Sequence, residues 1–350
     1  MDQPGFCACP TLVGSLPHRD PRRVVERIIA TLGEMPAWPQ LPARDFRESM
    51  YIQYSEGLPG AVVDAAAERL TFSTEGRFQE ELERFYQAVV EQDVEPFAIS
   101  RDYALGLDLF LEQLGALATR PPWAKGQVTG PFSFAMTVTD ESKRSLAYHP
   151  ELLDVAVQGM AMKARWSARQ LGSVADRALV VLDEPYLCSF GSAFVNVPRE
   201  TVVDAIHTAV DAIHQEGCLA GLHCCGNTDW PLCFETGIDL LNLDAFEFFQ
   251  GLPLYPEELG AFLDRGGVLS LGIVPTTDAV LELDAPALDR ALGERVALLE
   301  HKGFDRQRIF RQCLITPSCG LGSKSEAVAD RAIELLSELA SRLRQRGAFA

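Results

Sequence analysis

Short apolar runs alternate with longer amphipathic segments along most of this chain, and this alternation restricts the possible folds more than any other feature. The run ALVVL at residues 178–182 is apolar at every position, which is typical of a strand buried on both faces. From Trp123 onward there are six such runs, and five of them precede a pattern typical of an amphipathic helix. Repeated β–α units of this kind predict a parallel sheet covered by helices.

The predicted elements can be placed by residue number. Strands are expected at 11–16, 123–129, 178–182, 218–225, 239–248, 267–274 and 309–316, with one more near 39–42 or 97–100. Helices are expected at 21–32, 150–171, 199–215, 255–265, 285–302 and 324–344. About eight strands favour an α/β fold closed into a (β/α)₈ TIM barrel over an open, doubly wound sheet.

Length and composition agree with one domain. A barrel of about 250 residues with an insertion accounts for the 350 residues, of which 47% are hydrophobic. Residues 43–118 hold more helix than a minimal barrel needs, so we expect a helical insertion there, over one end of the barrel. With no low-complexity linker to divide the chain, residues 1–350 are predicted to form a single barrel domain.

Charge and cysteine content exclude several kinds of partner. The formal net charge is −18, and a strongly acidic surface argues against nucleic acid or an anionic membrane as a partner. No run approaches the ~18 apolar residues of a membrane span, and residues 1–5 lack the basic and apolar regions of a signal peptide. The nine cysteines are therefore expected to be reduced thiols in the cytoplasm.

Polar residues gather where the predicted strands end. Four segments lie at or just after such ends: Gly14-Ser15-Leu16-Pro17-His18, Asp183-Glu184-Pro185, His223-Cys224-Cys225-Gly226-Asn227 and Pro317-Ser318-Cys319-Gly320. The carboxyl ends of barrel strands carry the active site. The coincidence therefore predicts an enzyme.

The segment around His223 carries the clearest chemical signal. Residues i and i+2 of a strand point the same way, so His223 and Cys225 are expected to present an imidazole and a thiol to one side. Zinc favours this pair of ligands. Cys224 then faces the opposite side, where a small buried residue is expected. Cys319 follows the last apolar run in a glycine-rich turn and is the third candidate ligand.

Carboxylates complete the list of candidates. Asp244 and Glu247 both lie in the predicted strand 239–248, but they have opposite parity, so only one can face a metal, and spacing does not choose between them. Asp183 is predicted to bind a substrate ammonium or hydroxyl, or else to form a salt bridge at a neighbouring strand end. Ser15 is expected either to bind a substrate carboxylate or to cap a helix.

Taken in chain order, four short motifs resemble the catalytic barrel of cobalamin-independent methionine synthase. The motifs are Gly14-Ser15-Leu16-Pro17, Leu182-Asp183-Glu184-Pro185, His223-x-Cys225 and Pro317-Ser318-Cys319-Gly320-Leu321. The resemblance spans about residues 10–340. Wider relatives are the uroporphyrinogen decarboxylase barrels and the corrinoid:coenzyme M methyltransferases, and Cys225-Gly226-Asn227 is similar to the latter.

The resemblance implies a zinc ion held by His223, Cys225, Cys319 and a glutamate, with Glu247 in the glutamate position by its distance from Cys225. The sequence around Glu247 differs from that of the family, so Asp244 stays open as the ligand. The resemblance also implies that Ser15 and Asp183 hold the amino-acid part of homocysteine. It implies no catalytic residue beyond the zinc site.

The function implied is transfer of a methyl group to a thiol, with homocysteine as acceptor and methionine as product. The classical synthase has a second, N-terminal barrel that helps to hold its folate donor, and nothing in this sequence corresponds to it. Methyl-folate and a methyl-corrinoid protein are therefore both open as the donor. Two alternatives are a corrinoid:thiol methyltransferase of the coenzyme M type and a metal-free lyase similar to uroporphyrinogen decarboxylase. The uroporphyrinogen decarboxylases lack the His-x-Cys…Cys pattern, which argues against the lyase.

Overall fold

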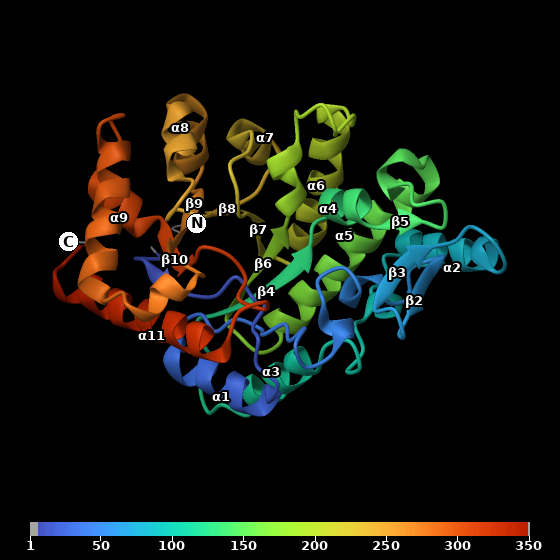
Figure 1. The fold of residues 1–350 in the computed structure, drawn as a ribbon, viewed down its shortest axis with the longest axis horizontal. Helices are drawn as coiled ribbons and strands as arrows, with labels where there is room; N and C mark the ends of the chain where they lie inside the picture. The colour runs from blue at the N-terminus through green and yellow to red at the C-terminus, as the bar shows by residue number, and fades with distance from the viewer. Residues whose placement is uncertain (1–5, 349–350) are drawn as a thin grey trace.

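A parallel sheet forms the centre of the molecule (Figure 1). The computed structural model describes residues 6–348. Within this range seven strands pair in parallel, in the order β1 (Cys9–Pro10), β10 (Cys313–Pro317), β9 (Val268–Val274), β8 (Leu240–Leu243), β7 (Leu219–Cys224), β6 (Arg177–Asp183) and β4 (Trp123–Thr129). Strands β4, β8, β9 and β10 are buried at every position, as the apolar runs predict.

A short extended segment, residues 36–40, closes the sheet into a barrel. On one side the Trp38 N–H donates to the carbonyl of Lys125 on β4 at 2.9 Å. On the other side the Leu16 N–H, in the segment that follows β1, donates to the carbonyl of Gln40 at 2.8 Å. This segment supplies the eighth strand position near one of the two places expected. The predicted (β/α)₈ barrel is confirmed.

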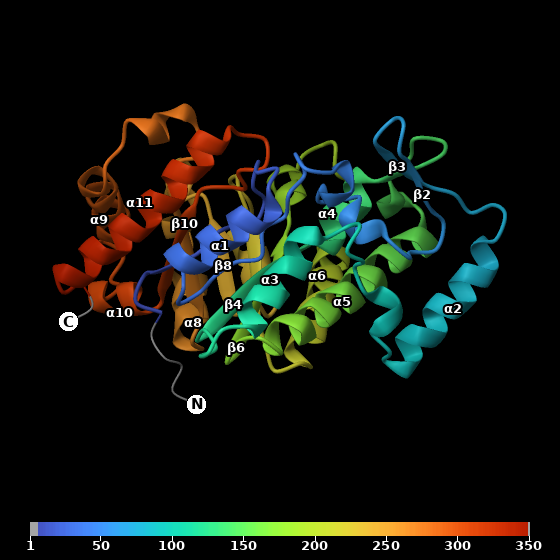
Figure 2. The same ribbon diagram turned by 90° about the horizontal axis from the view of Figure 1, so that it is seen from below.

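Helices surround the sheet on the outside (Figures 1 and 2). They are α1 (Pro21–Thr31), α3 (Leu105–Gly115), α5 (Pro150–Gly172), α6 (Arg199–His214), α7 (Trp230–Glu235), α8 (Pro256–Asp264), α9 (Ala285–Glu300) and α11 (Glu326–Gln345). Side chains cap several N-termini: Asp20 accepts from Arg23 N, Asp284 from Ala287 N and Ser325 from Val328 N. Within residues 6–348 no helix has both the length and the apolar character of a bilayer span.

Three predicted strands differ in their bounds: β1 covers Cys9–Pro10 instead of 11–16, β8 is shorter than 239–248, and 309–316 is only partly extended. Residues 309–316 were expected to be extended, but residues up to Arg311 belong to the helix α10 (Arg306–Arg311), and β10 begins at Cys313. Asp305 caps this helix by accepting from the Arg308 N–H at 2.7 Å. The cap starts a helical turn in a stretch whose apolar residues also suit a strand.

The insertion lies on one side of the barrel, beside α5 (Figures 1 and 2). It contains α2 (Phe78–Glu91) and three short 3₁₀ turns, η1 (Phe46–Glu48), η2 (Gln53–Ser55) and η3 (Glu95–Phe97). It also contains an antiparallel hairpin, β2 (Ala61–Asp64) with β3 (Arg69–Phe72), whose second strand pairs with β5 (Thr139–Asp140). The helical insertion is confirmed, but the sequence did not predict this hairpin. The last part of the 43–118 segment, α3, packs beside α1.

The barrel interior changes from apolar to polar along the strands. An apolar cluster fills the end where the strands begin and includes Trp123, Leu179, Leu219, Leu240, Val268 and Leu314. Towards the other end the register places Asp183 beside His223, and His223 beside Asn242. Asn242 donates to the hydroxyls of Ser270 and Thr316, both at 2.9 Å. The polar end is the carboxyl end of the strands, where barrels place their active sites.

Candidate metal centre

His223, Cys225 and Cys319 meet at the carboxyl end of the barrel. Their potential ligand atoms all lie within 4.8 Å of one another, and in residues 6–348 they form the group of histidine, cysteine and acidic side chains close enough to share a metal ion. His223 is near the end of β7 and is only 4% exposed. Cys225 follows β7 directly, and Cys319 lies in the loop after β10; both are half-buried. The structure thus brings together three predicted ligands from two distant segments.

The loop that carries Cys319 is held against the start of the chain. Leu321 N donates to the carbonyl of Ser15 at 2.8 Å, and the Ser15 hydroxyl accepts from the Gly322 N–H at 3.4 Å. A Cβ atom at Gly320 would lie 2.2 Å from the Ser15 Oγ, so a larger residue there would displace the Ser15 hydroxyl. Ser15 does not cap a helix, since Asp20 caps α1. Its hydroxyl lines the cavity described below, and its predicted contact with substrate stays a prediction.

His223 has the surroundings of a metal ligand. Both of its ring nitrogens are buried, and neither makes a well-formed hydrogen bond within the described part of the chain. Leaving such groups unsatisfied costs about 1–3 kcal/mol, so a metal bound to one nitrogen would relieve part of this cost. Burial lowers the pKa of His223, but the adjacent Cys319 and the charge of Asp183 raise it more, and the net direction is upward.

The two candidate thiolates differ in proton affinity. The pKa of Cys319 is lowered to about 4, because Cys225 donates a hydrogen bond to its sulfur and the His223 imidazole lies beside it. The pKa of Cys225 is raised, because the neighbouring sulfurs of Cys188 and Cys319 favour its protonated form and burial opposes its ionisation. Without a metal, the Cys319 sulfur is therefore stabilised as an anion by neighbouring thiol and imidazole groups. One nitrogen and two sulfurs are a donor set that suits zinc.

A third thiol beside Cys225 was missed by sequence reasoning. Cys188 lies in the short turn η5 (Pro185–Ser189), directly after the strand end at Asp183, and its Sγ atom is 3.5 Å from that of Cys224. Hydrogen bonds from Cys224 and Cys225 lower its pKa to about 3. Its position just beyond a strand end is the signal that could have identified it. Cys224 is fully buried, as expected.

The carboxylate prediction rested on a strand that is shorter than expected. β8 ends at Leu243 instead of extending through residues 239–248, because the Asp244 Oδ1 accepts from the N–H groups of Phe246 and Glu247, both at 2.9 Å. The parity argument therefore fails beyond Leu243. Asp244 is buried and burial raises its pKa to about 6, whereas Glu247 is exposed. In the part of the chain described, neither carboxylate belongs to the 4.8 Å group, and a ligand role for Glu247 stays a prediction.

A cavity of about 370 Å³ opens beside the three ligands and is lined in part by Ser15 and Asp183. The Asp183 Oδ1 is buried, and the carboxylate forms no hydrogen bond through that atom and no salt bridge in residues 6–348. Burial raises the pKa of Asp183 to about 6, although His223 and Lys125 oppose the shift. The salt-bridge alternative for Asp183 is wrong. A carboxylate oxygen without a protein partner fits a place for a substrate cation.

Lys125 is a second residue that sequence reasoning missed. It lies on β4, is 3% exposed, and its Nζ donates to the carbonyl of Val13. Burial lowers its pKa to about 8, and the charge of Asp183 opposes this shift. A lysine within the otherwise buried run WAKGQVT was the available signal. Lys125 thus places a cation close to the Asp183 carboxylate at the polar end of the barrel.

Comparisons with known proteins support the fold. Neither protein-family models nor curated proteins yield a match to the chain. The solved structure of a methyltransferase from Methanosarcina mazei superposes with a TM-score of 0.56, covering 99% of this chain and 95% of that chain at 12% identity. A β-glycosidase from Thermosphaera aggregans covers 94% of this chain and 87% of that chain, with a TM-score of 0.43 and 11% identity. The likeness to the methyltransferase shows that the two chains share the barrel fold.

Proposed function

We propose that this protein is a zinc-dependent methyltransferase that moves a methyl group from methyl-folate or a methyl-corrinoid protein to the thiol of homocysteine, giving methionine. The observation that supports the proposal is the meeting of His223, Cys225 and Cys319 within 4.8 Å at the mouth of the barrel. The likeness of the fold to a methyltransferase, over nearly the whole length of both chains, agrees with it.

The ligands are arranged in the manner of a catalytic zinc site. Structural zinc sites use closely spaced cysteines in short loops, whereas these ligands come from the end of β7 and the loop after β10. We assign Glu247 as the fourth protein ligand on the resemblance alone. Bound zinc would lower the pKa of a substrate thiol, so that sulfur is present as a nucleophilic thiolate at neutral pH.

The remaining residues of the cavity have binding roles in this proposal. Asp183 offers its unpaired oxygen to the ammonium group of homocysteine, and Ser15 offers its hydroxyl to the carboxylate. Lys125 stands close enough to Asp183 to favour its ionised form, which the ammonium needs. A volume of about 370 Å³ is near the lower limit of small-molecule sites, about 300–1,000 Å³. It therefore suits a small amino acid, with the donor presenting its methyl group at the mouth.

The test combines metal analysis with an assay of methyl transfer. Elemental analysis of the purified protein is expected to find one zinc per chain. Methyl-folate and methylcobalamin are then offered separately, each with homocysteine and with coenzyme M, and methionine formation is measured. Turnover of coenzyme M without homocysteine would move the chain to the corrinoid:thiol class and remove the role of Asp183. Bound zinc with no methyl transfer to either thiol would refute the activity and leave the metal centre standing.

A further inference from the structure

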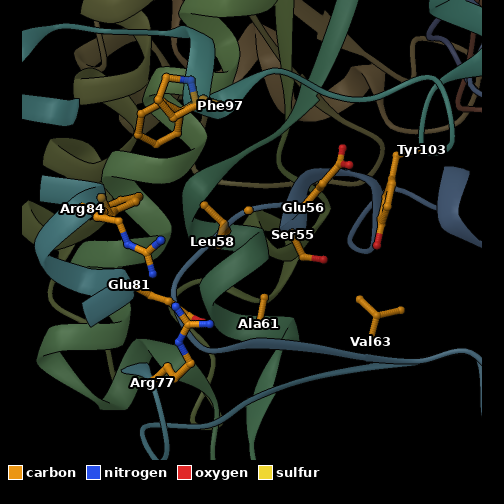
Figure 3. A pocket seen from close by; sticks show the side chains of 13 residues that line it. Ser55, Glu56, Leu58, Ala61, Val63, Arg77, Glu81, Arg84, Phe97 and Tyr103 are labelled. Carbon is orange, nitrogen blue, oxygen red and sulfur yellow. The ribbon is translucent and has the colours of Figure 1, made fainter. Parts of the chain in front are cut away.

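The insertion contains a cavity of its own, with a volume of about 680 Å³ (Figure 3). Every residue that lines it lies between Ser55 and Tyr103, so the wall comes from η2, β2, α2, η3 and the loops between them. It shares no lining residue with the cavity at the metal centre. This space is therefore a feature that the insertion adds to the barrel.

Two arginines from α2 and its start provide the cations of this cavity. Figure 3 shows the guanidinium groups of Arg77 and Arg84 directed towards the same part of the cavity, with Glu81 between them. Arg77 uses its Nε toward Glu80, 3.3 Å away, and Arg84 uses its Nε to donate to the carbonyl of Glu80 at 3.1 Å. Within residues 6–348 the terminal amino groups of both arginines make no hydrogen bond. They are free to form a fork around an anion.

The two carboxylates of the cavity are already engaged with the backbone. Glu81 accepts from the Gly60 N–H at 3.1 Å, and Glu56 accepts from the Ser100 N–H at 2.8 Å. These bonds fix the walls of the cavity. The lining holds two arginines and two glutamates, so its formal charge balances, but both carboxylates are engaged with backbone N–H groups while, among the described residues, the terminal amino groups of the arginines are not.

The rest of the cavity wall is largely apolar, and its base packs against the barrel. Leu58, Phe85 and Phe97 contribute apolar surface. Leu58 packs on α5 at Gly159, where an added Cβ would lie 2.5 Å from the leucine side chain. Beneath the base of the cavity, the fully buried Lys163 has its Nζ 3.4 Å from the carbonyl of Phe97. The base of the cavity therefore combines apolar contact with a positive charge below it.

We propose that this cavity binds a small organic anion, with a carboxylate or phosphate group held by Arg77 and Arg84 and an apolar body packed against Leu58 and Phe97. The site is independent of the proposed methyl transfer, because it shares no residue with the metal centre.

Calorimetric titration of the full-length protein tests the site. The probes are 4-phenylbutyrate for the carboxylate, phenyl phosphate for the phosphate and 4-phenylbutanamide as the neutral counterpart. At least one anionic probe is expected to bind the parent protein, whereas the amide binds at least about 10-fold more weakly, because it cannot form a charge-assisted fork. The double variant Arg77→Gln with Arg84→Gln is expected to lose about 10-fold or more in affinity for that probe.

Arg69→Gln is the matched control, since Arg69 is an exposed arginine of the same insertion, on β3, and does not line the cavity. The affinity of this variant is expected to equal that of the parent. Equal binding of the amide, equal binding by the double variant, or no binding of any anionic probe would overturn the proposal. If the double variant does not fold, Arg84→Lys decides: it keeps the charge but loses the planar fork, so unchanged affinity overturns the site. Zinc content and methyl transfer are measured separately, so failure of either proposal is recognised by itself.

Discussion

The candidate metal centre and the insertion cavity are built in different ways. At the metal centre the sheet brings together His223 and Cys319, which are far apart in the chain, and buries them with the charged groups Asp183 and Lys125. In the insertion a single continuous segment, residues 55–103, forms the wall and leaves its arginines in contact with water. Burial strongly shifts the pKa values of ionisable groups, as catalysis often requires. Exposed cations, by contrast, are available to bind anions.

Each region nevertheless has one buried lysine. Lys125 lies in the barrel within reach of Asp183, and Lys163 lies below the insertion within reach of Glu56. Burial lowers the pKa of both to about 8. The two lysines differ in their surroundings. Lys125 lies beside a carboxylate that lines the proposed substrate cavity, whereas Lys163 lies beneath the wall of the insertion cavity. Four predictions, which use five substitutions, test how the two regions differ.

The largest effect is expected from Cys319→Ser. A serine hydroxyl does not replace a thiolate as a zinc ligand, and loss of even an outer-shell partner weakens metal binding about 10–100-fold. We therefore expect zinc affinity to fall more than about 100-fold and methyl transfer to be lost with it. Zinc content after dialysis and the assay rate measure the two effects. Cys7→Ser, at the opposite end of the barrel, is the control, and a Cys319→Ser protein that holds zinc normally would show that the site is wrongly assigned.

Asp183→Asn is expected to separate substrate binding from metal binding. The amide keeps the shape but loses the charge that attracts the homocysteine ammonium. The loss is about 1.5–3 kcal/mol, the scale of a charged hydrogen bond, which corresponds to a KM for homocysteine raised roughly 10–150-fold. Zinc content is expected to stay unchanged. A parallel loss of zinc would place Asp183 at the metal instead of the substrate.

Lys163→Met tests the insertion by its pH dependence. Because the pKa of Lys163 is about 8 in the folded protein and higher in the unfolded chain, the folded state bears the cost of a buried charge at pH 7 and is relieved of it as pH rises towards 10. Methionine removes that cost, so we expect a gain of about 1–3 kcal/mol in the free energy of unfolding at pH 7 that shrinks towards pH 10.

Urea unfolding at several pH values measures the difference between variant and parent. Lys302→Met, at an exposed lysine, provides the matched control and should show no such trend. A Lys163→Met gain that is the same at pH 7 and pH 10 would contradict a charged Lys163 below the cavity. Zinc content is expected to be unaffected, which keeps this region separate from the metal centre.

The smallest effects distinguish the two carboxylates. If Glu247 is the fourth ligand, Glu247→Gln should weaken zinc binding about 10-fold, the lower limit for perturbing a ligand shell. Asp244→Asn should change it less, because an amide oxygen can still accept the two backbone N–H bonds of the turn. Competition with a chromophoric chelator measures both affinities. The reverse order would assign the ligand to Asp244.

Much of the site could be predicted because the relevant geometry is local. The parity of a strand is enough to place His223 and Cys225 on one side and to bury Cys224 on the other. Cys319 follows from the rule that polar residues at strand ends share one face of a barrel. The parity of Asp244 and Glu247 could not be predicted in this way, because the Asp244 carboxylate accepts hydrogen bonds from the backbone N–H groups of the turn, and the strand ends at Leu243.

By itself, then, the sequence determined the alternating β–α architecture, its inward and outward faces and three of the candidate ligands, because periodicity and caps act over a few residues. Only the tertiary structure decided which distant groups meet: Cys188 beside Cys225, Lys125 near Asp183, and a hairpin and helix that enclose a cavity. Those contacts depend on strand register, barrel closure and the docking of Leu58 on α5. These contacts join residues that no local sequence pattern relates, so they are determined by the packing of the whole chain.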